Sequence, residues 1–301
     1  MNIKNIHPKF GSIVTFDDPQ DFFKVSPDYW RNLIYERKLV VIKKFNASID
    51  DYVNLCHNFG KMWKSKDYVY SREKALPVDV KGQTFTVSPM SNKISKLLGM
   101  GHMPWHADIP NRKTNPFPHR ALWMLKNPNS KSGLTSWLDL EEGLDRLPDN
   151  LRSQIPDIRV VQQSWYEEGK DIQEFGFVKT HPISGADSLR INYMNDSKHD
   201  ISNGWIKSVY YKNELYEEPK QVLQKFFDFL ETQPDLIYTH EWDMYDVVIY
   251  DNWSSVHKRT ELVFDEMLER LFYRANIDHV TNDQWSQHKL EMSKIFDNFL
   301  I

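Results

Sequence analysis

The sequence predicts a β-rich α+β fold, with a double-stranded β-helix (jelly-roll) core and flanking helices. Two observations favour this class. Short apolar runs of strand length recur along the 301 residues, whereas amphipathic helical stretches are few and lie mostly in the first half. Many short strands separated by turn residues are typical of closed β architectures. No repeat or linker-like composition divides the chain, so we expect one domain over residues 1–301.

The first half begins with clear helix and strand signals. Ser26 before Pro27 is a helix start, because a hydroxyl caps free N–H groups and proline suits the first helical position. The apolar run at 39–42 is interpreted as a buried strand. A second helix is expected from a capping Ser48 to Gly60, and Cys56 on its inner face is interpreted as a small buried hydrophobe.

The remaining elements are less regular. Residues 67–104 mix aromatic residues, charges, prolines and glycines, and we expect short strands and a long loop there. A helical stretch at 140–155 is interrupted by Pro148, and 219–231 is an amphipathic helix. Further strands are predicted at 121–125, 188–193, 247–250 and 271–277.

Composition excludes several classes of protein. One cysteine cannot form an internal disulfide or a cysteine-based metal centre. A net charge of −4 gives no electrostatic signature of nucleic-acid binding. No run of apolar residues is long enough for a membrane helix, and the N-terminus has no secretory pattern. We therefore expect a cytoplasmic protein with neither nucleic-acid nor membrane partners.

The most informative tripeptide is His106-Ala107-Asp108. On a strand, residues i and i+2 point to the same face, so the imidazole and the carboxylate can address one point. These would be two of the three ligands of a 2-His-1-carboxylate iron site. His257, which follows a β-branched strand and a polar turn, is the best candidate for the second histidine, and the alternative is a surface histidine.

The segment from Arg270 to Ile277 carries two arginines in a strand-like pattern. Alternation would place Arg270, Phe272 and Arg274 on one face. A buried arginine needs an anionic partner, and a dicarboxylate co-substrate could supply one through a bidentate contact. The alternative is a surface salt bridge with Glu266 or Glu269.

Together these motifs resemble the taurine dioxygenase (TauD/TfdA-like) branch of the Fe(II)/2-oxoglutarate-dependent oxygenases. The resemblance covers about residues 39 to 277 in the family's order. It rests on the strand 39–42 with the helix ending Asn58-Phe59-Gly60, Trp105-His106-Ala107-Asp108, Gly133-Leu134-Thr135-Ser136-Trp137, Leu144 to Pro148, Thr180-His181-Pro182, Asp246 to His257, and Arg270 to Asn276.

The resemblance implies a role for each matched residue. His106, Asp108 and His257 would bind Fe(II) and act with O₂ as the catalytic centre. The co-substrate 2-oxoglutarate would lie with its distal carboxylate on Arg270 and Thr135. Arg274 would contact either the co-substrate or an anionic substrate group. Trp137 and Asn252 would line the pocket or support it, whereas His181 is interpreted as structural.

The sequence departs from the family pattern at three places. Tyr245 stands where the family has glycine, which puts a turn geometry in doubt. Leu134 replaces a family aspartate, and the segment between His257 and Arg270 is two residues longer than in taurine dioxygenase; these two departures argue against taurine as the substrate. Asp108 is present, and because halogenating relatives lack this carboxylate, the chain resembles an oxygenating enzyme.

The substrate is not encoded in these motifs. We hypothesise that residues 67–104 form a substrate-covering loop and that the substrate is a small, charged metabolite, such as an amino acid or another small carboxylate. The candidate substrate residues in this region, each of which could equally be a surface or packing residue, are Tyr68, Tyr70, Arg72, Ser88 and Asn92. The sequence leaves a homodimer or higher homo-oligomer open.

Three alternatives remain at this point. Desaturation or cyclisation would use the same residues as hydroxylation. A zinc-dependent hydrolase could use the two histidines and the aspartate, but it gives Arg270 no role. A non-catalytic, cupin-like metal-binding domain would be favoured if a ligand or Arg270 were missing, and all are present.

Overall fold

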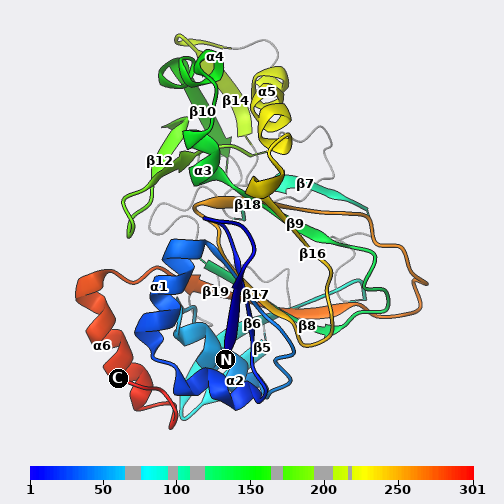
Figure 1. Ribbon diagram of the computed structural model, residues 1–301, viewed down its shortest axis with the longest axis vertical. Coiled ribbons are helices and arrows are strands. Elements are labelled where there is room, and N and C mark those ends of the chain that lie inside the picture. Colours follow the sequence, from blue (N-terminus) through cyan, green and yellow to red (C-terminus); the bar gives the residue numbers. More distant parts are fainter. Residues whose placement is uncertain (65–75, 94–100, 109–118, 164–171, 193–205, 216–218) are drawn as a thin grey trace.

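The computed structural model describes residues 1–64, 76–93, 101–108, 119–163, 172–192, 206–215 and 219–301. The described chain is β-rich, with helices at both ends of the molecule (Figure 1). The α-helices are α1 (Pro27–Arg37), α2 (Ile49–His57), α3 (Leu140–Asp145), α4 (Asp149–Arg152), α5 (Pro219–Glu231) and α6 (Asn282–Ser293).

The strands of the described residues form a nine-stranded first sheet, a four-stranded second sheet, and two further small groups of four and two strands. The first sheet has the order β1 (Asn2–Asn5), β2 (Ser12–Thr15), β3 (Leu39–Ile42), β17 (Val247–Asp251), β8 (His119–Lys126), β19 (Leu271–Asp278), β6 (Gln83–Ser91) and β5 (Leu76–Val80), with β4 (Lys61–Met62) also paired to β19. The second has the order β16 (Ile237–His240), β9 (Thr135–Asp139), β18 (Ser255–Arg259) and β7 (Met103–His106). The smaller groups contain β10 (Ile158–Gln163), β11 (Ile172–Gly176), β14 (Ile206–Tyr211) and β15 (Glu214–Leu215), and the pair β12 (Val178–Thr180) and β13 (Asp187–Leu189).

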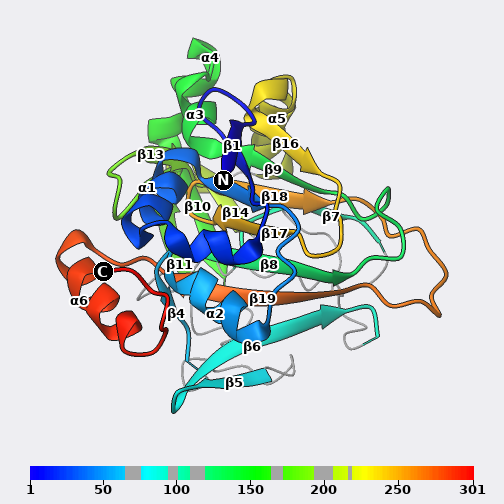
Figure 2. The ribbon, with the colours of Figure 1, turned by 60° about the horizontal axis from the view of Figure 1, so that its bottom comes forward.

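The chain passes repeatedly between the first and the second sheet. Strands β6, β8, β17 and β19 belong to the first sheet, and β7, β9, β16 and β18 to the second, so the chain crosses between sheets as it moves from β6 to β9 and from β16 to β19. Figure 2 shows the sheets as layers, with β9, β16 and β18 on one side and β8, β19 and β6 on the other. This crossing brings β7 beside β18, although they are far apart in sequence.

The core lies on both sides of this assembly. Under α1, α2 and α6, aromatic side chains pack against the first sheet, and Trp30 stacks on Phe22 with ring centroids 4.3 Å apart. A second cluster joins α3 and α5 to β10 and β14 and includes Phe226 and Val160. Burial of these apolar surfaces is the main stabilising term of such a fold.

Local signals explain the helices that the sequence predicted. Ser26 caps α1 by accepting from the Asp28 N–H, and Ser48 forms a capping box with Asp51 at the start of α2. Cys56 is buried, and α5 has the predicted bounds. Helix α2 ends at His57 rather than at Gly60, because Asn58 is already its C-terminal cap.

Other elements differ from the expectation. The strand predicted at 188–193 is β13, which spans only Asp187–Leu189 within the described residues. Within 67–104, where short strands and a long loop were expected, residues 76–91 contain the strands β5 and β6 of the first sheet. Helix α6 was not predicted, although Thr281 and Gln284 form a capping box at its start.

Tyr245, which stands where the resemblance expects glycine, has a backbone conformation that favours glycine. Its φ is +67°, in the left-handed region that glycine enters without strain. Its backbone N–H donates to the Met124 carbonyl oxygen, and its carbonyl oxygen accepts from the Phe45 N–H, both at 2.7 Å. Tyr245 therefore occupies a hydrogen-bonded turn in this chain, with a positive φ.

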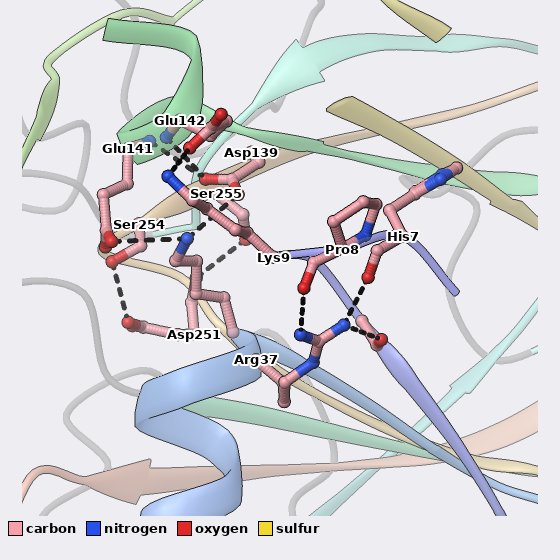
Figure 3. A network of polar contacts seen from close by, with 12 residues as sticks. His7, Pro8, Lys9, Arg37, Asp139, Glu141, Glu142, Asp251, Ser254 and Ser255 are labelled. Carbon is pink, nitrogen blue, oxygen red and sulfur yellow. Dashed lines mark hydrogen bonds and ion pairs between the residues drawn. The ribbon is translucent and has the colours of Figure 1, made fainter. Parts of the chain in front are cut away.

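A buried polar network at the end of α1 holds the segment that follows β17 (Figure 3). Arg37 donates to the backbone carbonyl oxygens of His7 and Pro8, while Asp139 accepts from the first N–H groups of α3. The Asp251 N–H donates to the Lys38 carbonyl oxygen at 2.8 Å, and the Asp251 carboxylate accepts from the Ser254 hydroxyl.

In the part of the chain that the structure describes, no helix is long and apolar enough to cross a membrane.

Candidate active site

Two antiparallel strands bring the predicted histidines together. His106 ends β7 and is the register partner of His257 in β18, and their ring centroids are 4.1 Å apart. Asp108 follows β7 by two residues, and its Oδ2 lies 3.8 Å from the His257 Nε2. One ligand atom from each of the three residues falls within 4.8 Å of the other two. The spacing of His106 and Asp108 predicted that their side chains address one point, and in the structure these side chains and that of His257 do lie together.

Hydrogen bonds fix the orientation of the first histidine. The His106 Nδ1 lies 2.7 Å from the Pro104 carbonyl oxygen. Because a carbonyl only accepts, Nδ1 carries the proton and Nε2 keeps its lone pair for a metal. The His257 Nδ1 has no hydrogen-bond partner among the described residues.

Three neighbours hold Asp108 in place. The Asn252 side chain clamps its backbone, accepting from the Asp108 N–H at 2.9 Å and donating to the Asp108 carbonyl oxygen at 2.5 Å. The Tyr250 hydroxyl donates to Oδ2 at 3.2 Å, and the Arg120 Nε lies 3.3 Å from the same oxygen. Tyr250 and Arg120 were not predicted, because nothing in their local sequence distinguishes them from core residues of a strand.

The charges of the cluster suit metal binding. Burial alone would raise the pKa of Asp108, but Arg120 and the two imidazoles outweigh it and hold that pKa well below its usual range. Burial, together with His106, lowers the pKa of His257 to about 3. An ionised carboxylate and a neutral imidazole are the forms that coordinate divalent metals, so the residues fit the implied Fe(II).

Arg270 is a buried guanidinium that makes no ion pair within the described ranges. Its Nη2 donates to the Gly133 carbonyl oxygen at 3.0 Å, and its Nε has no partner there. Burial lowers its pKa to about 9, with the nearby Arg259 as a further cause. The alternative of a surface salt bridge with Glu266 or Glu269 is not formed among the described residues, where Arg270 is buried and Glu269 pairs with Lys126 at 2.6 Å.

Gly133 makes room for this guanidinium. Its φ is +61°, and a Cβ at this position would lie 2.1 Å from the Leu262 Cδ2 and 3.3 Å from the Arg270 Cζ. The glycine of the Gly133-Leu134-Thr135 segment is therefore required both by its backbone conformation and by the space around it.

The other predicted residues lie on the neighbouring strands. The Thr135 hydroxyl accepts from the Trp242 Nε1 at 2.9 Å, and Trp137 is the register partner of His257 on β9. Arg274 is buried opposite Ser88, its register partner on β6. Asn92 accepts from the Arg270 backbone N–H at 2.9 Å. Tyr68, Tyr70 and Arg72 lie outside the described residues.

His181 stays outside this site, as its interpretation as a structural histidine requires. Its Nδ1 accepts from the N–H groups of Ile183 and Ser184 at 3.1 and 3.0 Å, which closes the turn after Thr180-His181-Pro182. Its Nε2 lies 3.0 Å from an Asp251 carboxylate oxygen, a contact that the sequence did not suggest.

Two known proteins are similar to this chain in sequence. The (S)-phenoxypropionate/alpha-ketoglutarate-dioxygenase of Sphingobium herbicidovorans is 24% identical over 197 residues, which are 59% of this chain and only 62% of that protein. Pentalenolactone F synthase of Streptomyces avermitilis is 25% identical over 293 residues, 87% of this chain and 86% of that protein.

Solved structures share the fold. A taurine dioxygenase from Burkholderia xenovorans superposes with a TM-score of 0.65 at 18% identity, covering 93% of this chain and 91% of that one. AAD-2 in complex with Mn(II) and N-oxalylglycine gives a TM-score of 0.64 at 19% identity, covering 93% and 97%.

The family is shown by a match to a family model. The model described as "Taurine catabolism dioxygenase TauD, TfdA family" matches residues 2–276, a span that contains every residue of the cluster and Arg270. Members of this family use Fe(II), 2-oxoglutarate and O₂. The chain belongs to the TauD/TfdA family of Fe(II)- and 2-oxoglutarate-dependent dioxygenases.

Proposed function

We propose that His106, Asp108 and His257 hold the Fe(II) and that Arg270 receives the distal carboxylate of 2-oxoglutarate. One combined observation carries this proposal. Asp108 is ionised and held in place, and Arg270 is buried and has no carboxylate partner among the described residues. A buried guanidinium without an anion is costly, and a dicarboxylate co-substrate would satisfy it through two parallel N–H···O bonds.

The bound metal and co-substrate would supply activation of O₂, coupled to conversion of 2-oxoglutarate to succinate and CO₂. The protein's own groups prepare the site. Pro104 fixes the tautomer of His106, Asn252 and Tyr250 fix the carboxylate of Asp108, and Arg120 keeps it ionised. Three protein ligands leave coordination positions open for the co-substrate and O₂.

Arg274 supports a small carboxylate as the substrate that is hydroxylated at a C–H bond. It lies on β19 four residues after Arg270, and its positive charge helps to lower the pKa values of both Asp108 and His257. A second cation this close to the cluster can hold an anionic group next to the reacting position. The relative from Sphingobium herbicidovorans, whose name includes phenoxypropionate, acts on a substrate of this class.

Several coarser expectations belong to the same proposal. The alternation of the chain between the nine-stranded first sheet and the four-stranded second sheet supports a jelly-roll core within a single domain over 1–301. The remaining sequence predictions, a covering role for parts of 67–104, a cytoplasmic location and a homodimer or higher homo-oligomer, stay predictions.

The test is succinate release over a panel of substrates. The purified chain is supplied with Fe(II), 2-oxoglutarate and O₂, and amino acids and other small carboxylates are compared with their amides or esters. We expect an acid to stimulate succinate release and its neutral derivative to fail. Mass spectrometry of the product distinguishes hydroxylation, which adds one oxygen atom, from desaturation or cyclisation, which removes hydrogen. Equal stimulation by acids and neutral derivatives would contradict the substrate class.

A further inference from the structure

A second group of side chains of metal-ligating types shares no residue with the group of His106, Asp108 and His257, which we call the catalytic cluster. It consists of His119 at the start of β8, Asp251 at the end of β17, and His279, which follows β19. One ligand atom from each falls within 4.8 Å of the other two. The Asp251 Oδ1 lies 3.7 Å from the His119 Nδ1 and 3.9 Å from the His279 Nε2. We call these three residues the second cluster.

His119 is an independent indication that an ion binds in the second cluster. The residue is fully buried, and neither of its ring nitrogens has a hydrogen-bond partner among the described residues. Buried polar atoms are rarely left in this state, and each calls for an explanation such as an unseen ion. Burial, with His279 nearby, keeps the pKa of His119 well below its usual value, so the ring is in its neutral, metal-binding form.

His181 supports the carboxylate and is not itself a ligand. Its Nδ1 accepts two backbone N–H groups, so its proton must sit on Nε2, which faces an Asp251 oxygen at 3.0 Å. The Trp253 N–H and the Ser254 hydroxyl also donate to the Asp251 carboxylate at 2.9 and 3.0 Å. Such hydrogen bonds to a ligating carboxylate are the usual outer contacts of a metal site.

His279 completes the second cluster from the segment after β19. Its Nδ1 lies 3.4 Å from the hydroxyl oxygen of Tyr35 on α1, and either group can donate in this contact. The tautomer that donates from Nδ1 leaves Nε2, which lies 3.9 Å from an Asp251 oxygen, with a lone pair for a metal. The His119 and His279 rings are 4.3 Å apart at their centroids.

We propose that His119, Asp251 and His279 form a second metal site, which takes a divalent transition ion of the Zn²⁺ type and is separate from the catalytic iron. Two imidazoles and one carboxylate are ligands that Zn²⁺ accepts, with water in the fourth place. The ion would join β8, β17 and the segment after β19. Because Asn252 follows Asp251 directly and clamps Asp108, the second ion would also steady the catalytic carboxylate.

The experiment measures bound zinc in the full chain. His106→Ala/His257→Ala removes two ligands of the catalytic cluster, and the variant is dialysed against Zn²⁺ before metal analysis. We expect about one Zn²⁺ per chain to remain. Adding His279→Asn should remove this ion, whereas adding His57→Phe should leave it. His57 is the matched control, because it is equally buried, yet no carboxylate completes a metal group around it within the described ranges.

Folding is checked independently by thermal unfolding with and without Zn²⁺. In the His106→Ala/His257→Ala background, Zn²⁺ should raise the unfolding temperature, and it should not do so after His279→Asn. The proposal is overturned if the background variant binds no zinc and gains no stability from it, or if His279→Asn leaves the bound zinc unchanged. Neither result bears on 2-oxoglutarate binding by the wild-type chain, so the proposed function is tested separately.

Discussion

The molecule contains two groups of two histidines and one aspartate, and they differ in access and in support. In the catalytic cluster, the side chains of His257 and Asp108 are 10% and 12% exposed. In the second cluster, the side chains of His119 and Asp251 are 0% and 2% exposed. The side chains of the first cluster are therefore the more exposed of the two groups. The second is closed and is suited to holding strands together.

The charged groups around the two clusters also differ. Arg120 lies 3.3 Å from Asp108, and Arg274 adds a further positive charge. Asp251 is surrounded mainly by histidines, of which His181 is the nearest. If both proposals hold, the comparison teaches that one donor set serves reaction where cations surround it and serves stability where it is more deeply buried.

The largest expected effect separates the two aspartates. Asp108→Asn should abolish succinate release, and it should also lower the free energy of unfolding, because the buried Arg120 loses its ionised partner. Asp251→Ala should lower the free energy of unfolding by about 3 kcal/mol, because it removes the acceptor of a buried network. Urea unfolding and succinate assays measure the two effects. The exposed Asp145→Ala is the control, and a stable, fully active Asp251→Ala protein would break the comparison.

Arg270 is expected to give the next largest effect. Removing one partner of a buried charge pair costs about 3 kcal/mol, or about a hundredfold in affinity. Arg270→Ala should therefore raise the KM for 2-oxoglutarate about a hundredfold, whereas Lys126→Ala, an exposed cation near the same edge of the sheet, should not change it. Steady-state kinetics with varied 2-oxoglutarate measure this, and a KM within a few-fold of wild type would count against the assignment.

Asn252 should produce a smaller change. The side chain bonds to both the N–H and the carbonyl oxygen of Asp108, so its loss frees the ligand to move. Outer contacts of this kind are worth about 10- to 100-fold in metal affinity. Titration of the Asn252→Ala variant with Mn²⁺ should show this weakening, and the exposed Asn150→Ala should not. Unaltered affinity would mean that the clamp is dispensable.

The smallest expected effect is the pH dependence of stability that comes from buried histidines with no carboxylate beside them. Burial holds the pKa of His57 well below its usual value, so the folded chain keeps this ring neutral. Below about pH 6.5 the unfolded chain takes up the proton and the folded chain does not, so stability falls as pH falls, by up to about 1.4 kcal/mol per pH unit for each such histidine. Urea unfolding of metal-free protein at two pH values should show a smaller loss for His57→Phe than for wild type. An equal loss would exclude His57 as a source.

The catalytic cluster could be predicted because its signals are local. His106 and Asp108 are two residues apart on a strand, and His257 and Arg270 follow recognisable segments. The clamp by Asn252 was anticipated only through the resemblance. Arg120 and Tyr250 could not be predicted, because they reach Asp108 through the pairing of β8 with β17, which no single segment encodes.

The second cluster was missed for the same reason. His119, Asp251 and His279 are far apart in the sequence, and each looks like an isolated polar residue at the end of a strand. Only the register of the first sheet, in which His119 pairs with both Asp251 and Ile277, brings them together. Strand ends were predicted well at 247–250 and 271–277, whereas the order of strands in the sheet was not.

The central claim is that His106, Asp108 and His257 bind Fe(II) in a way that lets 2-oxoglutarate chelate it beside Arg270. The most direct measurement is the visible absorption of the full chain after anaerobic addition of Fe(II) and 2-oxoglutarate. The wild type should develop the charge-transfer band of the chelate, and His106→Ala/His257→Ala should not. A wild type without the band, or a double variant that retains it, would contradict the claim.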